Sequence, residues 1–261
     1  MADMNYVSVT GGISEEEVKG IIKEFREAGY TMDSSHAPAI GFLVSEKTLN
    51  GLPTPNKRFA KFEDIPLLVK AACEDVLPVI HYNSRNLETL SEQVKKAFGG
   101  IYKLCRTVQL NTEWPDPFEV YRIKEYLDEL SIILQVSYKA MEGRGVKEIA
   151  DKVIGYGDSI DYVLIDPSKG RGVSFDVSHS VSLYKEIKSK KDYSIVFAGG
   201  LCRENVLIVL AELLDRIGTT DFSVDAEGRL RDKHSDRFFG DDILNLEKVR
   251  KYLVNASKVL K

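Results

Sequence analysis

The sequence is poor in cysteine, which limits the chemistry available to it. Its 261 residues include three cysteines, Cys73, Cys105 and Cys202. Three widely separated thiols exclude a disulfide framework and a CxxC metal site. The four histidines show no metal-ligand spacing, and no H-E-x-x-H motif is present. We therefore expect free thiols in a reducing, cytoplasmic setting, with no bound metal and no other cofactor.

Long apolar runs and concentrated positive charge are also missing. No segment approaches the ~20 apolar residues that a membrane-crossing helix needs. The N-terminus "MADMNYVSVTGG" lacks the basic start and apolar centre of a secretory signal. The net charge is −4 and the isoelectric point is about 5.7, whereas nucleic-acid binding needs a concentrated basic surface. These absences predict no membrane insertion and no nucleic-acid partner.

The chain does contain a regular alternation of short apolar strands and longer helical patterns. A helical pattern follows each strand, and in the first of them Ser14 and Glu17 form a capping box. The eight predicted strands are residues 6–10, 39–45, 77–82, 107–110, 131–136, 161–166, 193–198 and 221–226. Alternation of this kind demands parallel strands with helical crossovers.

Eight strand-helix units in about 250 residues match the size of a (β/α)8 TIM barrel. The alternative is a doubly wound open sheet, which usually carries a G-x-G-x-x-G turn after its first strand. The corresponding turn here reads "TGGIS", which does not match. No linker rich in Pro, Gly or Ser divides the units. We therefore predict an α/β protein with a single (β/α)8 barrel domain spanning residues 1–261.

A barrel of this type has its active site at the carboxyl ends of the strands. Four residues at predicted strand ends are candidates for substrate contact: Thr10, Gly11, His81 and Asn111. For His81 a plainer interpretation is also open, because a histidine near a strand end is often a polar side chain with satisfied hydrogen bonds.

Glycines follow three consecutive strands, at Gly170 and Gly172, at Gly199 and Gly200, and at Gly228. Phosphate is bound best by several backbone N–H groups and a helix N-terminus, and side chains would block that approach. TIM barrels frequently hold phosphate with the loops after strands seven and eight. The three glycine loops therefore predict a binding site for a small phosphorylated substrate.

Asp166 ends the otherwise apolar segment "DYVLID". In one interpretation its carboxylate caps the following turn or pairs with Lys169 or Arg171. In the other it is a general acid whose pKa is raised by partial burial at the mouth of the barrel. Its position is equally compatible with both interpretations.

The segments "YVLIDPSKGRGVSFD", "VFAGGLCRENV" and "SVDAEGRLRD…FGDDILNLEKVRKYL" together resemble the C-terminal half of the phosphoribosylanthranilate isomerase family of the tryptophan pathway. That family reads approximately LLD with a glycine loop and FDW, then LAGGL-x-x-ENV, then VD-x-SSGVE. The resemblance covers roughly residues 161–253, with looser matches of "GGIS" to CGIT and of "TPNKRF" to SPRY. It implies the same barrel fold.

Members of that family convert an aminoaldose phosphate into an aminoketose phosphate by an Amadori rearrangement. The resemblance implies that Asp166 is the general acid, that Arg58 contacts the aromatic end of the substrate, and that the glycine loops bind phosphate. The family's general base is a cysteine, and its position falls on Gly11. Glycine cannot abstract a proton, so another group has to supply this step if the reaction is retained.

Three functions are compatible with these residues. The first is an isomerase of the phosphoribosylanthranilate type, in which Asp33, Glu227 or His81 replaces the cysteine. The second is a barrel enzyme that keeps Asp166 and the phosphate site but acts on another sugar phosphate. The third is a non-catalytic relative that binds a phosphorylated metabolite or a protein partner. The register of the acid, the arginine and the glycine loops favours the first, and we expect a monomer or homodimer.

Overall fold

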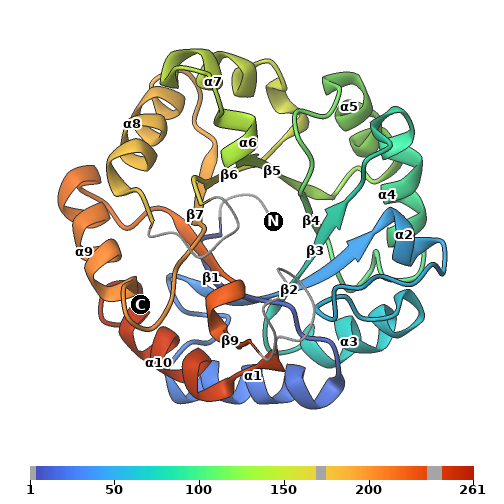
Figure 1. Ribbon diagram of the computed structural model, residues 1–261, viewed down its shortest axis with the longest axis horizontal. Helices are drawn as coiled ribbons and strands as arrows, with labels where there is room; N and C mark the ends of the chain where they lie inside the picture. The colour runs from blue at the N-terminus through green and yellow to red at the C-terminus, as the bar shows by residue number, and fades with distance from the viewer. Residues whose placement is uncertain (1–3, 169–174, 234–242) are drawn as a thin grey trace.

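The computed structural model describes residues 4–168, 175–233 and 243–261, and these contain a closed eight-stranded barrel (Figure 1). Every strand is parallel to its neighbours, and the first pairs with the last. The strands are β1 (Tyr6–Thr10), β2 (Ala37–Ser45), β3 (Leu77–Asn83), β4 (Thr107–Leu110), β5 (Ser131–Ser137), β6 (Tyr162–Asp166), β7 (Ser194–Ala198) and β8 (Ser223–Ala226). The predicted (β/α)8 barrel is confirmed, and the open sheet is excluded.

Helices form a ring around the barrel (Figure 1). In α1 the backbone N–H of Glu17 donates to Ser14 Oγ at 3.2 Å, which is one half of the predicted capping box. The other half is absent, because the Glu17 carboxylate accepts from the N–H of Ile13 and not from that of Ser14. Within the described ranges, none of the helices combines the length and apolar character of a transmembrane span. The helices of the ring are α1 (Glu15–Glu27), α3 (Ile65–Ala72), α4 (Leu90–Phe98), α5 (Pro117–Tyr126), α7 (Val146–Ile154), α8 (Val177–Lys188), α9 (Val206–Ile217) and α10 (Leu246–Ala256).

Short additional elements decorate the loops. Two single-turn helices follow strands directly and are capped by the last residue of the strand: Ser45 caps the one after β2, and Ser137 caps the one after β5. Elements this short show no periodicity, so the sequence did not predict them. They are α2 (Glu46–Leu49), α6 (Tyr138–Met141), η1 (Phe62–Asp64), η2 (Leu87–Thr89), η3 (Gly157–Ser159), η4 (Gly228–Leu230), β9 (Arg231–Asp232) and β10 (Ile243–Leu244).

Side chains that point into the barrel change from apolar to polar along the strands. Alternate residues of a strand face the same side of a sheet. On β3, Val79 belongs to the apolar cluster inside the barrel, and His81 is the next residue on that side. On β5, Ile133 and Gln135 show the same change. The barrel is therefore filled at its amino end and lined by polar groups at its carboxyl end.

Candidate functional site

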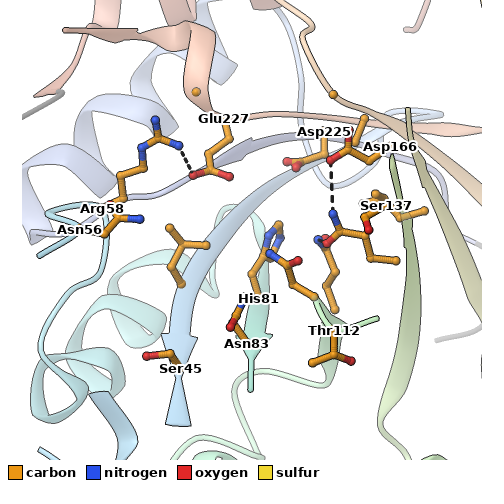
Figure 2. A pocket seen from close by; sticks show the side chains of 18 of the residues that line it. Ser45, Asn56, Arg58, His81, Asn83, Thr112, Ser137, Asp166, Asp225 and Glu227 are labelled. Carbon is orange, nitrogen blue, oxygen red and sulfur yellow. Dashed lines mark hydrogen bonds and ion pairs between the residues drawn. The ribbon is translucent and has the colours of Figure 1, made fainter. Parts of the chain in front are cut away.

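A cavity of about 1040 Å³ opens at the carboxyl ends of the strands, and Figure 2 shows part of its lining. Thr10 and Gly11 are not part of the lining. Gly170 and Gly172 lie outside the described residues. The structure brings the remaining predicted site residues together in this one cavity: Arg58, His81, Asn111, Asp166, Gly199, Gly200 and Gly228.

Asp166 is held at the end of β6 by three hydrogen-bond donors. Its Oδ1 accepts from both the N–H and the hydroxyl of Ser168, at 3.0 and 2.6 Å. Its Oδ2 accepts from Gln135 Nε2 at 3.3 Å (Figure 2), and Gln135 Oε1 accepts from Gln109 Nε2 at 3.0 Å. Asp166 thus does cap its turn, as the plainer interpretation predicted, yet it also lines the cavity. The predicted alternative partners Lys169 and Arg171 lie outside the described residues.

The environment of Asp166 favours its protonated form. Burial raises the pKa of this carboxyl to about 6, and the nearby carboxylates of Asp225 and Glu227 act in the same direction, against the hydrogen bonds from Ser168. A group with a pKa near the working pH can both donate a proton and take one back. Asp166 therefore has the proton affinity that a general acid requires.

Gly199 is required by its contact with Asp166. Its φ of +96° lies in the left-handed region, and a Cβ there would lie 2.1 Å from Asp166 Oδ1 and 2.7 Å from Ser168 Oγ. No side chain can approach a carboxylate so closely. The glycine that follows β7 therefore allows the carboxyl at the end of β6 to lie against the backbone.

The next two residues, which also line the cavity, have backbone donors without an acceptor in the described part of the chain. Gly200 has a φ of +75°, and its carbonyl accepts from Asn205 Nδ2 at 2.9 Å and from Arg229 Nη1 at 3.3 Å. No described residue accepts a hydrogen bond from the N–H of Gly200 or of Leu201. Two such N–H groups beside an exposed guanidinium are suited to an anion. Arg229 was not among the sequence candidates.

Arg58 reaches inward from the loop after β2. Its Nη1 donates to Glu227 Oε1 at 2.8 Å (Figure 2), and the arginine side chain is 10% exposed while that of Glu227 is 30% exposed. A Cβ on Gly228 would lie 3.5 Å from each terminal nitrogen of Arg58. The guanidinium therefore lies against the loop after β8, next to a predicted phosphate-binding glycine.

We expect the Arg58–Glu227 pair to stabilise the fold by more than a surface ion pair does. A double-mutant cycle of Arg58→Met and Glu227→Gln, followed by urea unfolding, is expected to give a coupling energy of about 1–3 kcal/mol, because the pair is largely desolvated. The matched control is Lys19 with Glu15, whose side chains are 68% and 53% exposed. That pair is expected to give about 0.5 kcal/mol or less. Equal couplings in the two cycles would contradict the prediction.

Gly11, where the resembled family has its base, is covered by Arg231. The buried guanidinium donates from Nη2 to the Gly11 carbonyl. A Cβ on Gly11 would lie 2.2 Å from that nitrogen, and the φ of Gly11 is +103°. Position 11 therefore cannot carry a side chain while Arg231 stays in place. Nothing in the sequence pattern indicated this contact between residues 220 positions apart.

A buried polar cluster lies between β1, β3 and β8. Thr10 Oγ1 donates to Asp225 Oδ1 at 2.8 Å and lies 3.5 Å from His81 Nε2. Gly41 of β2 makes room for this contact, because a Cβ there would lie 2.2 Å from Thr10 Oγ1 and 2.6 Å from His81 Nε2. Burial lowers the pKa of His81, although Asp225 and Glu227 oppose that effect.

The three candidates for a replacement base are thus separated by the structure. Asp33 is exposed in the segment that precedes β2, at the amino end of the barrel, and does not line the cavity. Glu227 lines the cavity and is paired with Arg58. His81 lines the cavity and contacts Thr10. Among the described residues, no group of three His, Cys, Asp or Glu side chains is arranged to hold a metal ion.

No protein-family model matches the sequence, and no curated protein matches it. Among solved structures, the chain is similar to phosphoribosyl anthranilate isomerase from Thermus thermophilus, with a TM-score of 0.63 and 16% identity over 97% of this chain and 98% of that one. For the enzyme of that name from Thermotoga maritima the TM-score is 0.62 and the identity 18%, over 98% of this chain and 100% of that one. For tryptophan synthase subunit alpha from Legionella pneumophila the TM-score is 0.58 and the identity 12%, over 98% of this chain and 92% of that one. At such identities these similarities establish the TIM-barrel fold, which barrels named for different activities share.

Proposed function

We propose that this protein is an isomerase of the phosphoribosylanthranilate type, which converts a phosphorylated aminoaldose into the corresponding aminoketose. The observation that carries the proposal is Asp166, a cavity-lining carboxyl at the end of β6 with a pKa of about 6. The sequence resemblance over residues 161–253 supports it. So does the similarity of fold to structures named for that activity.

Asp166 supplies the proton for ring opening. When the bond between C1 and the ring oxygen breaks, that oxygen needs a proton and an iminium forms at C1. Oδ1 of Asp166 is engaged by two donors of Ser168, which leaves Oδ2 as the oxygen that carries the transferable proton. Gln135 orients that oxygen. The carboxylate that remains can take up a proton in a later step.

The two ends of such a substrate find different environments in the cavity. The phosphate is placed on the loops after β7 and β8, near the N–H groups of Gly200 and Leu201 and the guanidinium of Arg229. The part of the cavity lined by β2, β3 and the loops that follow them is partly apolar, and we assign an aromatic amine to it. Its apolar residues are Leu43, Pro55, Phe59 and Leu87.

A second candidate function is the same type of chemistry on a different sugar phosphate. Arg231 at Gly11 favours it, because the position of the family's base is filled by a cationic side chain. A substrate with a different shape or a more acidic proton would suit such a site.

A turnover assay tests the proposal. Phosphoribosylanthranilate is generated in situ because it is unstable, and formation of 1-(o-carboxyphenylamino)-1-deoxyribulose 5-phosphate is followed. We expect turnover that inorganic phosphate inhibits competitively. Absence of turnover, together with binding of simple sugar phosphates, would favour the second candidate. Binding without turnover across a panel of sugar phosphates would favour a non-catalytic relative.

A further inference from the structure

We propose that His81 is the general base of this site and that Thr10 and Asp225 are the residues that position it. The inference rests on the proposed isomerisation, since that is the reaction whose base is missing at Gly11. His81 replaces the cysteine from a different strand, β3 in place of the end of β1.

The hydrogen bonds assign the tautomer of the imidazole. The hydroxyl of Thr10 has one proton, and it donates that proton to Asp225 Oδ1. Thr10 Oγ1 can therefore act towards His81 Nε2 only as an acceptor, so Nε2 carries the ring proton. The lone pair is then on Nδ1, for which no described residue provides a hydrogen-bond partner. A neutral imidazole with one nitrogen anchored and the other available is the arrangement that a general base needs.

Gly41 shows that this contact is built into the barrel. β2 runs between β1 and β3, and an ordinary side chain at position 41 would separate Thr10 from His81, with its Cβ 2.2 and 2.6 Å from the two contacting atoms. Glycine in a strand interior costs stability, because it has no side chain to pack and more backbone freedom to lose. Its presence here brings together two side chains from strands that are not adjacent.

The charges around the ring suit a base that becomes cationic during the reaction. The neighbouring strands contribute uncharged side chains beside His81, Leu43 from β2 and Gln109 from β4. The charged groups that act on it are Asp225 and Glu227, both acidic. Burial lowers the pKa of His81, which keeps the ring neutral before the reaction, and the two carboxylates stabilise the imidazolium that forms.

The position of His81 relative to Asp166 completes the geometry. β3 and β6 are three strands apart in the closed ring of eight, so the two residues enter the cavity from separate parts of its wall (Figure 2). A substrate in the cavity lies between them. The acid can then act on the ring oxygen while the base acts on C2 from the other side.

Asp166 and His81 together account for every proton transfer in the proposed reaction. Asp166 gives its proton to the ring oxygen, and the C1 iminium forms. His81 Nδ1 takes the C2 proton; the C2–H electron pair becomes the C1=C2 bond, and the iminium electron pair returns to nitrogen. The imidazolium then delivers a proton to C1, while the 2-hydroxyl gives its proton to the Asp166 carboxylate as the ketone forms. Both residues end in their starting states, with no other reactant consumed.

His81→Gln tests the base with phosphoribosylanthranilate as the substrate. We expect kcat to fall by about 10²–10⁴-fold with little change in KM, since the base acts only as the proton is transferred. His179→Gln is the matched control, because this histidine lies on α8 outside the cavity. It is expected to keep wild-type kinetics. In case His81→Gln folds poorly, His81→Ala provides a second readout: added imidazole is expected to restore turnover.

Asp225→Asn tests the positioning residues. Because Asp225 raises the pKa of both His81 and Asp166, we expect both inflections of the pH dependence of kcat/KM to move to lower pH. A purely structural role would lower the rate and leave the inflections in place, which would overturn the positioning role. An active wild type with an equally active His81→Gln variant overturns the inference alone. A wild type that does not turn over phosphoribosylanthranilate overturns the proposed function and the inference together.

Discussion

Asp166→Asn is expected to lower kcat by about 10²–10⁴-fold, because asparagine occupies the same volume but cannot donate an acidic proton. The wild-type rate is expected to fall as pH rises above about 6, since the proposed mechanism uses the protonated carboxyl and its pKa is about 6. Measurement of kcat and kcat/KM for both proteins between pH 5 and pH 9 checks both statements. A variant that retains the wild-type rate would show that Asp166 is not the acid.

The same substitution is expected to increase stability above pH 6. The folded protein binds the Asp166 proton more tightly than the unfolded chain does, because burial raises the pKa from 3.8 to about 6. Stability contributed by the protonated carboxyl is therefore fully present at low pH and is lost as pH rises from about 4 through about 6. At pH 8 the ionised carboxylate costs the wild type on the order of 3 kcal/mol, which asparagine avoids.

Urea unfolding at pH 5 and pH 8 measures this effect. The difference in unfolding free energy between Asp166→Asn and wild type is expected to grow in the variant's favour as pH rises. Asp33→Asn removes the same charge from an exposed position outside the cavity and serves as the control. If the gain in unfolding free energy of Asp166→Asn over wild type were the same at both pH values, burial would not raise the pKa of the Asp166 carboxyl. Lower activity with higher stability would mark Asp166 as a functional residue.

Gly199→Ala is expected to damage both stability and catalysis. The new methyl group would have to occupy space 2.1 Å from Asp166 Oδ1, and the backbone at φ +96° disfavours any residue with a Cβ. We expect the free energy of unfolding to fall by about 2–4 kcal/mol, from backbone strain together with displacement of a packed polar group. We also expect kcat to fall by about 10²-fold or more, since a displacement of about 1 Å in a catalytic group has an effect of this size.

Gly218→Ala separates the loss of stability caused by backbone strain from the loss caused by the collision with Asp166. Gly218 ends α9 with a φ of +85°, and a Cβ there would meet nothing within 4 Å. That variant therefore carries the backbone strain alone and is expected to lose about 1 kcal/mol and to keep its activity. Thermal or urea unfolding of both variants gives the comparison. If the two glycines proved equally tolerant, the close approach of the Asp166 carboxyl to β7 would not exist in solution.

The strands were predictable because their signal is local. Each runs for a few apolar residues and ends in a turn, so the predicted boundaries agree with β1 and β4 at both ends and with β6 and β7 to within one residue. Asp166 could be identified for the same reason, as the first polar residue after an apolar run. Gln135 carries a comparable signal, because it is a polar side chain inside the apolar strand "SIILQVS".

The remaining features of the site depend on contacts between distant segments. Arg58 and Glu227 are 169 positions apart, and Thr10 and Asp225 are 215 apart. Hydrophobic periodicity carries no information about which polar side chains meet across a barrel. For this reason the orientation of Arg58 and the environment of His81 could only come from the structure.

The contact between Arg231 and Gly11 also restricts how this protein can evolve. A cysteine introduced at position 11 would collide with the guanidinium, whereas loss of Arg231 would remove a donor from the Gly11 carbonyl. Loss of Arg231 would remove the collision but not the backbone strain at φ +103°, so two independent features disfavour a side chain at position 11. A single substitution at either position therefore does not make room for a cysteine side chain on an unstrained backbone. The backbone conformation and Arg231 thus both restrict position 11 to glycine.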